Sequence, residues 1–293
     1  LSSQWGLVGS INYLLNILAA KKYAISYYIF PQSIGPFNYS ISSKIILYPL
    51  LSFYLKYPEK IFLREDEGVK SISKFAKNNI EKSYDIVLQS GRYNIDNIYK
   101  EVPHLKNIAI EPNSVGVVPN IRVIERTKTD EIYLVYKLLI NKLIDIGKNV
   151  YILRHSYEDL EICENIKNIF SENQKVRLIA DDLNAIELEN IIKQCDFLIA
   201  SRYHSIVHSY KNGVPCLVIG WATKYFDLLK NFDQLDYFFD GRNTIDLHKI
   251  NNKLDKMIQC YKYEKEKIIE RMNIINNKEN IFNEVFEHMK KTN

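Results

Sequence analysis

Residues that suit the chemistry of a small anion lie close together in the segment 200–224, ASRYHSIVHSYKNGVPCLVIGWATK. The Arg202 guanidinium is a planar fork that matches a carboxylate or a phosphate, and the Lys224 ammonium is a point charge for the same kind of ligand. His204 titrates near neutral pH and can therefore move a proton. Ser201 adds a hydroxyl beside Arg202. We expect this cluster to bind an anionic substrate and to transform it.

The segment has the pattern of two parallel strands joined by a helix. The apolar runs 197–202 and 216–221 read as buried strands, and the helix predicted over 205–212 ends before Gly213 and Pro215. In parallel sheets the ligand lies outside the carboxyl ends of the strands, where helix amino termini converge. We therefore expect the cluster to lie at that edge, with Trp221 as an aromatic contact for the substrate.

The same residues allow plainer interpretations. A single arginine after a strand is usually a surface ion pair, so the prediction depends on the joint placement of the cluster at two neighbouring strand ends. His204 and His208 are four residues apart, as in a zinc pair, but the segment lacks the HExxH glutamate and a third ligand. We predict no metal and assign His208 to packing.

Length and composition exclude several classes of protein. The 293 residues are enough for two domains, and 46% hydrophobic with 25% charged residues is typical of a soluble globular chain. No apolar run approaches the roughly 20 residues of a spanning helix. The net charge of +4 is too small for a dense nucleic-acid-binding face. Four widely spaced cysteines predict reduced thiols in a cytoplasmic protein.

Strand-like runs alternate with helix-like segments along most of the chain, which predicts an α/β fold with parallel sheets. Pro112, Gly116 and Pro119 interrupt the periodicity, and we place a domain boundary there. The predicted domains are residues 1–112 and 113–245, followed by a helical tail over 246–293. Further strands are expected at 26–31, 61–64, 85–89, 107–111, 149–155 and 175–180.

The cluster segment resembles the signature of the polysaccharide pyruvyltransferases, which has Ser-Arg-x-His, a helix, Gly-x-Pro, an apolar strand and then a lysine. Three further stretches agree with the family in the same order. They are FPQSIGPF at 30–37, FLREDEGVKSI at 62–72 and VYILRHSYED at 150–159. The resemblance extends from about residue 25 to residue 232, and its most specific part is the segment with Arg202 and His204.

The resemblance implies two Rossmann-like domains similar to those of GT-B glycosyltransferases, with the active site between them. It implies phosphoenolpyruvate as donor substrate, no cofactor, and a sugar of a cell-surface polysaccharide or lipid-linked oligosaccharide as acceptor, joined as a pyruvate ketal. Matching positions imply that His204, Arg64 and Lys224 are essential for catalysis. They also imply that Arg202 and His155 bind the substrate. The expected location is cytoplasmic, with peripheral membrane contact where the acceptor is lipid-linked.

The sequence also departs from the family, and two alternatives stay open. The Gly-rich loop of the family has no counterpart beyond WGLVGS at 5–10, so we expect an incomplete amino-terminal domain. One alternative is a GT-B nucleotide-sugar glycosyltransferase, although those enzymes generally carry a glutamate on the helix where this chain has RYHSIVHSYKNG. The other is a family member that keeps the fold and has lost the chemistry.

Overall fold

The chain folds into two compact α/β units. The structure is a computed structural model that describes residues 1–89, 94–101, 103–126, 129–278 and 280–292. The first unit is Leu1–Gln89 together with Ile275–Asn293, and the second is Ser90–Ile274. All strand pairs in both sheets are parallel, so the predicted fold class is confirmed in each unit.

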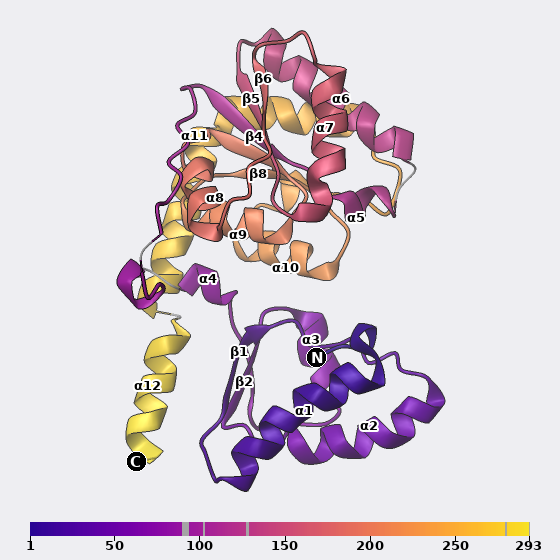
Figure 1. Ribbon diagram of the computed structural model, residues 1–293, viewed down its shortest axis with the longest axis vertical. Helices are drawn as coiled ribbons and strands as arrows, with labels where there is room; N and C mark the ends of the chain where they lie inside the picture. The colour runs from indigo at the N-terminus through magenta and orange to yellow at the C-terminus, as the bar shows by residue number, and fades with distance from the viewer. Residues whose placement is uncertain (90–93, 102, 127–128, 279, 293) are drawn as a thin grey trace. The chain divides into compact units, whose positions relative to one another are not determined.

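The first unit is built on a three-stranded sheet in the order β1-β2-β3 (Figure 1). Side chains alternate across a strand, so Ile61 and Leu63 of β2 pack with the helices α1 and α2, while Phe62 packs with α12 on the opposite face. The elements of this unit are β1 (Tyr28–Gln32), β2 (Lys60–Leu63), β3 (Ile80–Lys82), α1 (Gly6–Lys22), α2 (Ile41–Tyr54), α3 (Asp66–Ile72), α4 (Ile86–Gln89) and α12 (Ile281–Thr292).

The second unit contains a six-stranded sheet in the order β6-β5-β4-β7-β8-β9. This is the doubly wound order, in which strands are added to one side of the first strand and then to its other side, so that the switch point lies between β4 and β7. The strands are β4 (Ser114–Val118), β5 (Asn149–Leu153), β6 (Val176–Ile179), β7 (Phe197–Ala200), β8 (Cys216–Gly220) and β9 (Phe238–Asp240). The helices are α5 (Ile121–Ile124), α6 (Thr129–Asp145), α7 (Leu160–Ile169), α8 (Ala185–Ile192), α9 (Tyr203–Lys211), α10 (Thr223–Asn231) and α11 (Leu247–Lys278).

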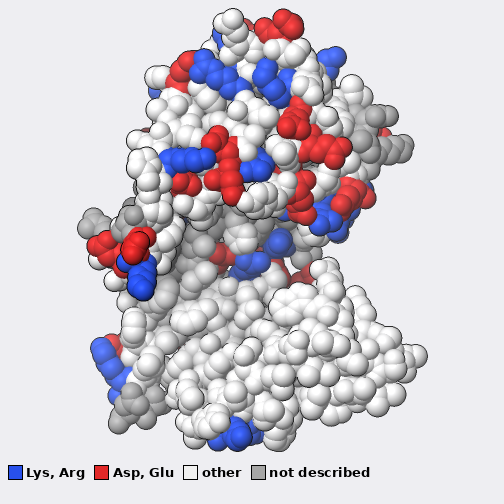
Figure 2. Space-filling model, viewed as in Figure 1, with Lys and Arg blue, Asp and Glu red and all other residues white. Residues whose placement is uncertain are grey.

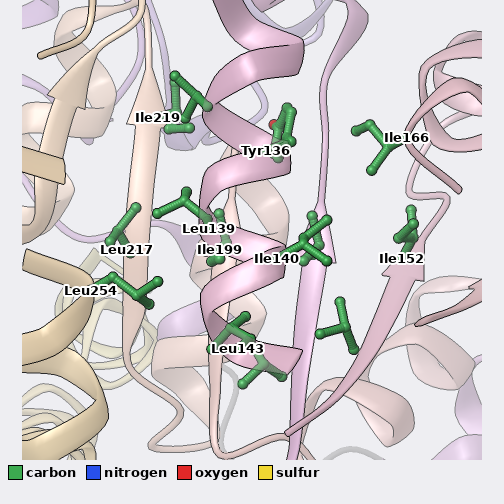
Figure 3. Packing of buried hydrophobic residues seen from close by; sticks show 14 of the residues in the cluster. Tyr136, Leu139, Ile140, Leu143, Ile152, Ile166, Ile199, Leu217, Ile219 and Leu254 are labelled. Carbon is green, nitrogen blue, oxygen red and sulfur yellow. The ribbon is translucent and has the colours of Figure 1, made fainter. Parts of the chain in front are cut away.

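The main core of the second unit lies between the sheet and the helices that cover it. Tyr136, Leu139, Ile140 and Leu143 recur at helical spacing along α6, and all four are buried (Figure 3). They belong to one cluster with apolar side chains of the strands, such as Ile199 of β7. This packing fixes α6 and the strands whose carboxyl ends carry the predicted site.

Two predicted strands are wrong. Residues 86–89 form the short helix α4, which begins where the Asp85 carboxylate accepts a hydrogen bond from the Val87 amide. Residues 107–111 form no strand, and the strand lies at 114–118 instead, within the segment that we interpreted as a domain break. The strand has glycine at position 116 because there is no room for a side chain: a Cβ here would lie 2.5 Å from Leu198 Cδ2.

The division into units differs from the prediction at two places. The boundary falls after Gln89, upstream of residue 112, because the intervening segment is bonded to the second unit: the Lys106 amide donates to Glu187 and the Ile110 amide to Gln194. The predicted tail over 246–293 is shared between the units, with the break at Ile274. None of the helices in the described ranges is long and apolar enough to cross a membrane.

Candidate active site

Ser201 anchors the loop that leaves β7 at the switch point of the second sheet. Its hydroxyl lies 2.9 Å from that of Tyr136, and its carbonyl oxygen accepts hydrogen bonds from Asn120 Nδ2 and from the Tyr225 hydroxyl, each at 3.0 Å. The side chain of Ser201 is fully buried. This placement gives Ser201 a positioning role. We had expected its hydroxyl to contact the substrate, but the hydroxyl is buried away from solvent.

Arg202 directly precedes α9 and is held by two carboxylates. Its Nε donates to Asp159 Oδ2 at 2.7 Å, and its Nη2 lies 2.5 Å from Asp159 Oδ1 and 2.6 Å from Glu158 Oε1. Asp159 is fully buried and also accepts the Ile121 amide at 3.0 Å. Asp159 therefore ties the end of β7 to the start of α5, and Arg202 is oriented and partly neutralised before any ligand binds.

His204 and Lys224 come together around the ring of Tyr203. His204 is exposed on the first turn of α9, and its ring meets Tyr203 edge-on with centroids 5.4 Å apart. Lys224 Nζ lies 4.9 Å from the centroid of the same Tyr203 ring and 5.8 Å from that of Tyr225. Tyr203 itself is buried, so it is a fixed platform between α9 and α10. His204 and Lys224 thus both contact the ring of Tyr203 within the second unit.

His155 follows β5 and is neutral at neutral pH. Burial lowers the pKa of His155 to about 3, and the charges of His204, His208 and Arg202 add to this effect. His155 follows β5 and Arg202 follows β7, and these two strands flank β4, so both residues lie at the carboxyl edge of the second sheet. A neutral imidazole in that region can accept or donate a hydrogen bond without adding charge.

His208 points to a carboxylate that sequence reasoning did not identify as its partner. Its Nδ1 lies 3.0 Å from Glu189 Oε2, and Asn212 Nδ2 donates to Glu189 Oε1 at 3.1 Å. Burial opposes ionisation of Glu189, but hydrogen bonds from His208 and Asn212 and the charge of Lys211 bring its pKa down to about 2. Glu189 therefore joins α8 to α9, which agrees with a packing role for His208.

Trp221 lies just after β8 and packs on the edge of the main core. The Arg126 guanidinium stacks on its ring, with Cζ 4.0 Å from the centroid. The indole Nε1 is buried and has no hydrogen-bond partner among the described residues. Sequence reasoning missed Arg126, because it lies far from Trp221 along the chain in a segment without periodicity.

Arg64 belongs to the first unit, whereas the other candidate residues belong to the second. Its Nη1 lies 2.5 Å from Asp85 Oδ2, and Ser33 Oγ accepts from its Nε at 3.1 Å and from its Nη2 at 2.9 Å. Asp85 is almost fully buried. Arg64 therefore links the carboxyl ends of β1 and β2, and through Ser33 it joins the two family-like stretches at 30–37 and 62–72.

Within the described part of the chain, no group of three or more histidine, cysteine or acidic side chains is placed to hold a metal ion. The chemistry available from the described side chains is that of cations, an imidazole and hydroxyls. These groups can bind an anion and transfer a proton.

Comparison of the sequence with known proteins gives one family. The sequence model described as polysaccharide pyruvyl transferase matches residues 4–223. AmsJ, an amylovoran biosynthesis protein of Erwinia amylovora, is 23% identical over 158 residues, which cover 50% of this chain and 38% of AmsJ. The chain thus spans well under half the length of this relative.

Comparison of the structure gives glycosyltransferases of the GT-B class. OtsA superimposes with a TM-score of 0.54 at 13% identity, covering 93% of this chain and 69% of OtsA. TarM of S. aureus superimposes with a TM-score of 0.50 at 10% identity, covering 86% of this chain and 48% of TarM. Identities this low carry the fold alone, and the fold of each unit is the parallel α/β fold found in GT-B glycosyltransferases, as the sequence resemblance implied.

Proposed function

The chain belongs to the polysaccharide pyruvyl transferase family, and from that premise we propose that it moves pyruvate from phosphoenolpyruvate onto a sugar of a cell-surface polysaccharide or a lipid-linked oligosaccharide. The product is a cyclic pyruvate ketal. The observation that carries the proposal is the meeting of His204 and Lys224 around Tyr203, beside Arg202 at the switch point of the second sheet.

The donor-binding role of this region follows from charge. Phosphoenolpyruvate carries a carboxylate and a phosphate on a three-carbon frame, so its site requires cations and oriented N–H groups in a small space. Arg202 and Lys224 supply the cations, and the amino terminus of α9 supplies peptide N–H groups and the positive end of a helix dipole. Asp159 holds the Arg202 guanidinium in one orientation, which lowers the entropic cost of binding.

We assign the first two proton transfers of ketal formation to His204. The protonated imidazole donates a proton to the methylene carbon of the enol, and the first sugar hydroxyl adds its oxygen to C2 and releases its own proton to the imidazole. The C2–O bond to phosphate then breaks as the second hydroxyl adds to C2, and its proton leaves with inorganic phosphate. His204 is exposed, and an imidazole is a suitable proton carrier for this cycle.

The test separates binding from chemistry. We expect His204→Gln to abolish phosphate release in the presence of a lipid-linked acceptor while the calorimetric Kd for phosphoenolpyruvate changes by less than about threefold, because the imidazole acts mainly on the reacting carbon. We expect Lys224→Met to weaken donor binding by about tenfold or more, because it removes a charge-assisted contact. His248→Gln, which changes an exposed histidine of α11, is the matched control and should leave both measurements unchanged.

Other outcomes assign the chain to one of the alternatives. Phosphoenolpyruvate binding without phosphate release, with any acceptor of this class, contradicts the transferase and favours a member that has lost the chemistry. Binding of a uridine nucleotide without binding of phosphoenolpyruvate contradicts it in favour of a nucleotide-sugar glycosyltransferase. Full activity of His204→Gln removes His204 from the mechanism.

A further inference from the structure

The helices α1 and α2 of the first unit are apolar on both sides. Their inner sides bury residues such as Leu14, Ile17 and Leu47 in the core of the unit. Their outer sides expose a second set of apolar side chains, which we call the α1–α2 face: Trp5, Val8, Leu15, Leu18, Ile41, Ile45, Ile46 and Phe53. Helices with apolar residues all round are normally covered on all sides, and a contiguous exposed patch of this kind marks an interaction site.

The exposed and the buried side chains occupy different arcs of each helix. On α1, at about 100° per residue, Val8, Leu15 and Leu18 fall within an arc of about 80°, and the buried Leu14 and Ile17 lie beside this arc. On α2, Ile41 and Ile45 are 80% and 71% exposed. The exposed set therefore lies on two helices that contact each other, and Lys21 of α1 reaches the exposed Phe53 of α2.

The charge around this face has one sign. The first 58 residues contain no aspartate or glutamate, and their charged side chains are Lys21, Lys22, Lys44 and Lys56. Figure 2 shows the corresponding surface of the first unit as almost uncharged, with lysines gathered at one edge. Lys21 Nζ lies 3.8 Å over the ring of Phe53, so its aliphatic stem extends along the apolar surface from α1 to α2.

Aromatic side chains lie at both ends of α1. Trp5 precedes the helix and Tyr23 follows it, and they are 51% and 67% exposed. Tryptophan and tyrosine with this exposure favour the boundary between lipid headgroups and acyl chains, because one part of the ring is apolar and another forms hydrogen bonds.

We propose that the α1–α2 face binds the surface of a bilayer that contains anionic lipids. The helices lie in the plane of the interface, since their inner sides are occupied by the core of the unit. The apolar residues enter the headgroup boundary, and the four lysines contact lipid phosphates. Pairing with a second copy through the same face is disfavoured, because two symmetric faces would bring their lysines together without a carboxylate from either helix pair.

Vesicle sedimentation tests the proposal. The full chain is mixed with phosphatidylcholine vesicles with and without phosphatidylglycerol, at low and at raised ionic strength. We expect binding to the anionic vesicles that weakens with salt. The double variant Val8→Glu/Ile45→Glu should lower the partition coefficient at least tenfold on anionic vesicles, because it puts charge where apolar area is buried. Lys21→Glu/Lys22→Glu should lower it at least tenfold and reduce its dependence on salt.

The matched control replaces two exposed apolar residues by glutamate on the second unit. Leu134→Glu/Ile169→Glu replaces two exposed apolar residues of α6 and α7 and should bind vesicles like the unchanged chain. Circular dichroism confirms that each variant is folded. Absence of vesicle binding, or equal loss in the control variant, overturns the proposal. Self-association that Val8→Glu/Ile45→Glu abolishes, without vesicle binding, overturns it in favour of a dimer interface. Donor binding does not enter this experiment, so the proposed transfer reaction can fail independently.

Discussion

At the residue scale, two of the candidate cations, one in each unit, already have protein partners. Arg202 pairs with Asp159 and Arg64 with Asp85, and each carboxylate is nearly or fully buried. A buried ion pair adds little to stability, but removal of one partner leaves an uncompensated charge. These pairs therefore serve mainly to fix the direction of each guanidinium at the end of its strand.

The neutral state of His155 predicts a pH dependence of stability. Its pKa is about 3 in the folded state against 6.5 for an ordinary histidine, so below pH 6.5 the unfolded chain binds a proton that the folded chain does not. The free energy of unfolding should fall as the pH is lowered from 6.5 towards 3, by about 2 kcal/mol at pH 5 from this group. Urea unfolding at pH 7.5 and pH 5 measures it.

His155→Gln should remove this contribution, so that its free energy of unfolding falls less between the two pH values than that of the unchanged chain. His248→Gln alters an exposed histidine and should leave the difference as it is. An equal pH dependence in His155→Gln and the unchanged chain would contradict a half-buried His155 that stays neutral in the folded state.

The sequence allowed the types and strand-end positions of these residues to be predicted, but not their partners. Arg202 follows an apolar run, and that run fixes its place at the sheet edge. Asp159 lies 43 residues earlier, and no periodicity links the two. The contact of Glu189 with His208 was not predicted for the same reason, since it depends on how α8 packs against α9. Partner choice is a property of tertiary packing, which one sequence does not encode locally.

At the element scale, the helices and strands with strong periodicity were predictable and the irregular segments were not. The apolar residues of α6 follow the helical period, so this helix can be predicted from its sequence. The run 107–111 has a strand-like composition, but its backbone bonds to side chains such as Gln194 and does not pair with a strand. The strand at Gly116 was hidden because glycine and two prolines nearby resemble a loop.

The amino terminus of α8 gives a prediction at this scale. The Asn184 side chain accepts hydrogen bonds from the amides of Ile186 and Glu187, and Glu187 accepts from the Asn184 amide in return. Asn184→Ala should lower the free energy of unfolding by about 1 kcal/mol, because it leaves two amides of the first turn without their acceptor. Chemical denaturation measures the change.

Asn184→Asp keeps an acceptor at the same position and is the control, with a stability close to that of the unchanged chain. The Asn184→Ala substitution should loosen α8 most, because it acts at the first turn of the helix that holds Glu189 against His208. Equal stability of the two variants would show that the cap contributes nothing.

At the scale of the whole molecule, two parallel sheets were predictable from the alternation of strands and helices, but the path of the carboxyl-terminal segment was not. Ile281 and Val285 recur at helical spacing, which predicts a buried helical stripe without naming the core that covers it. They pack on Phe62, and the Ile281 amide donates to Gln89 Oε1 at 2.8 Å. The first unit is therefore assembled from both ends of the described chain.

This assembly predicts that the two units differ in their ability to fold alone. A fragment of residues 94–274 keeps the whole main core of the second unit and should unfold cooperatively in urea, as followed by circular dichroism. A fragment of residues 1–89 lacks α12 and leaves Phe62 and Gln89 without their partners, so it should unfold at lower urea concentration or without a cooperative transition. Addition of a peptide of residues 275–292 should restore cooperativity, whereas the same peptide with Ile281→Asp/Val285→Asp should not. A cooperative, stable 1–89 fragment that does not respond to the peptide would contradict a structural role for α12 in the first unit.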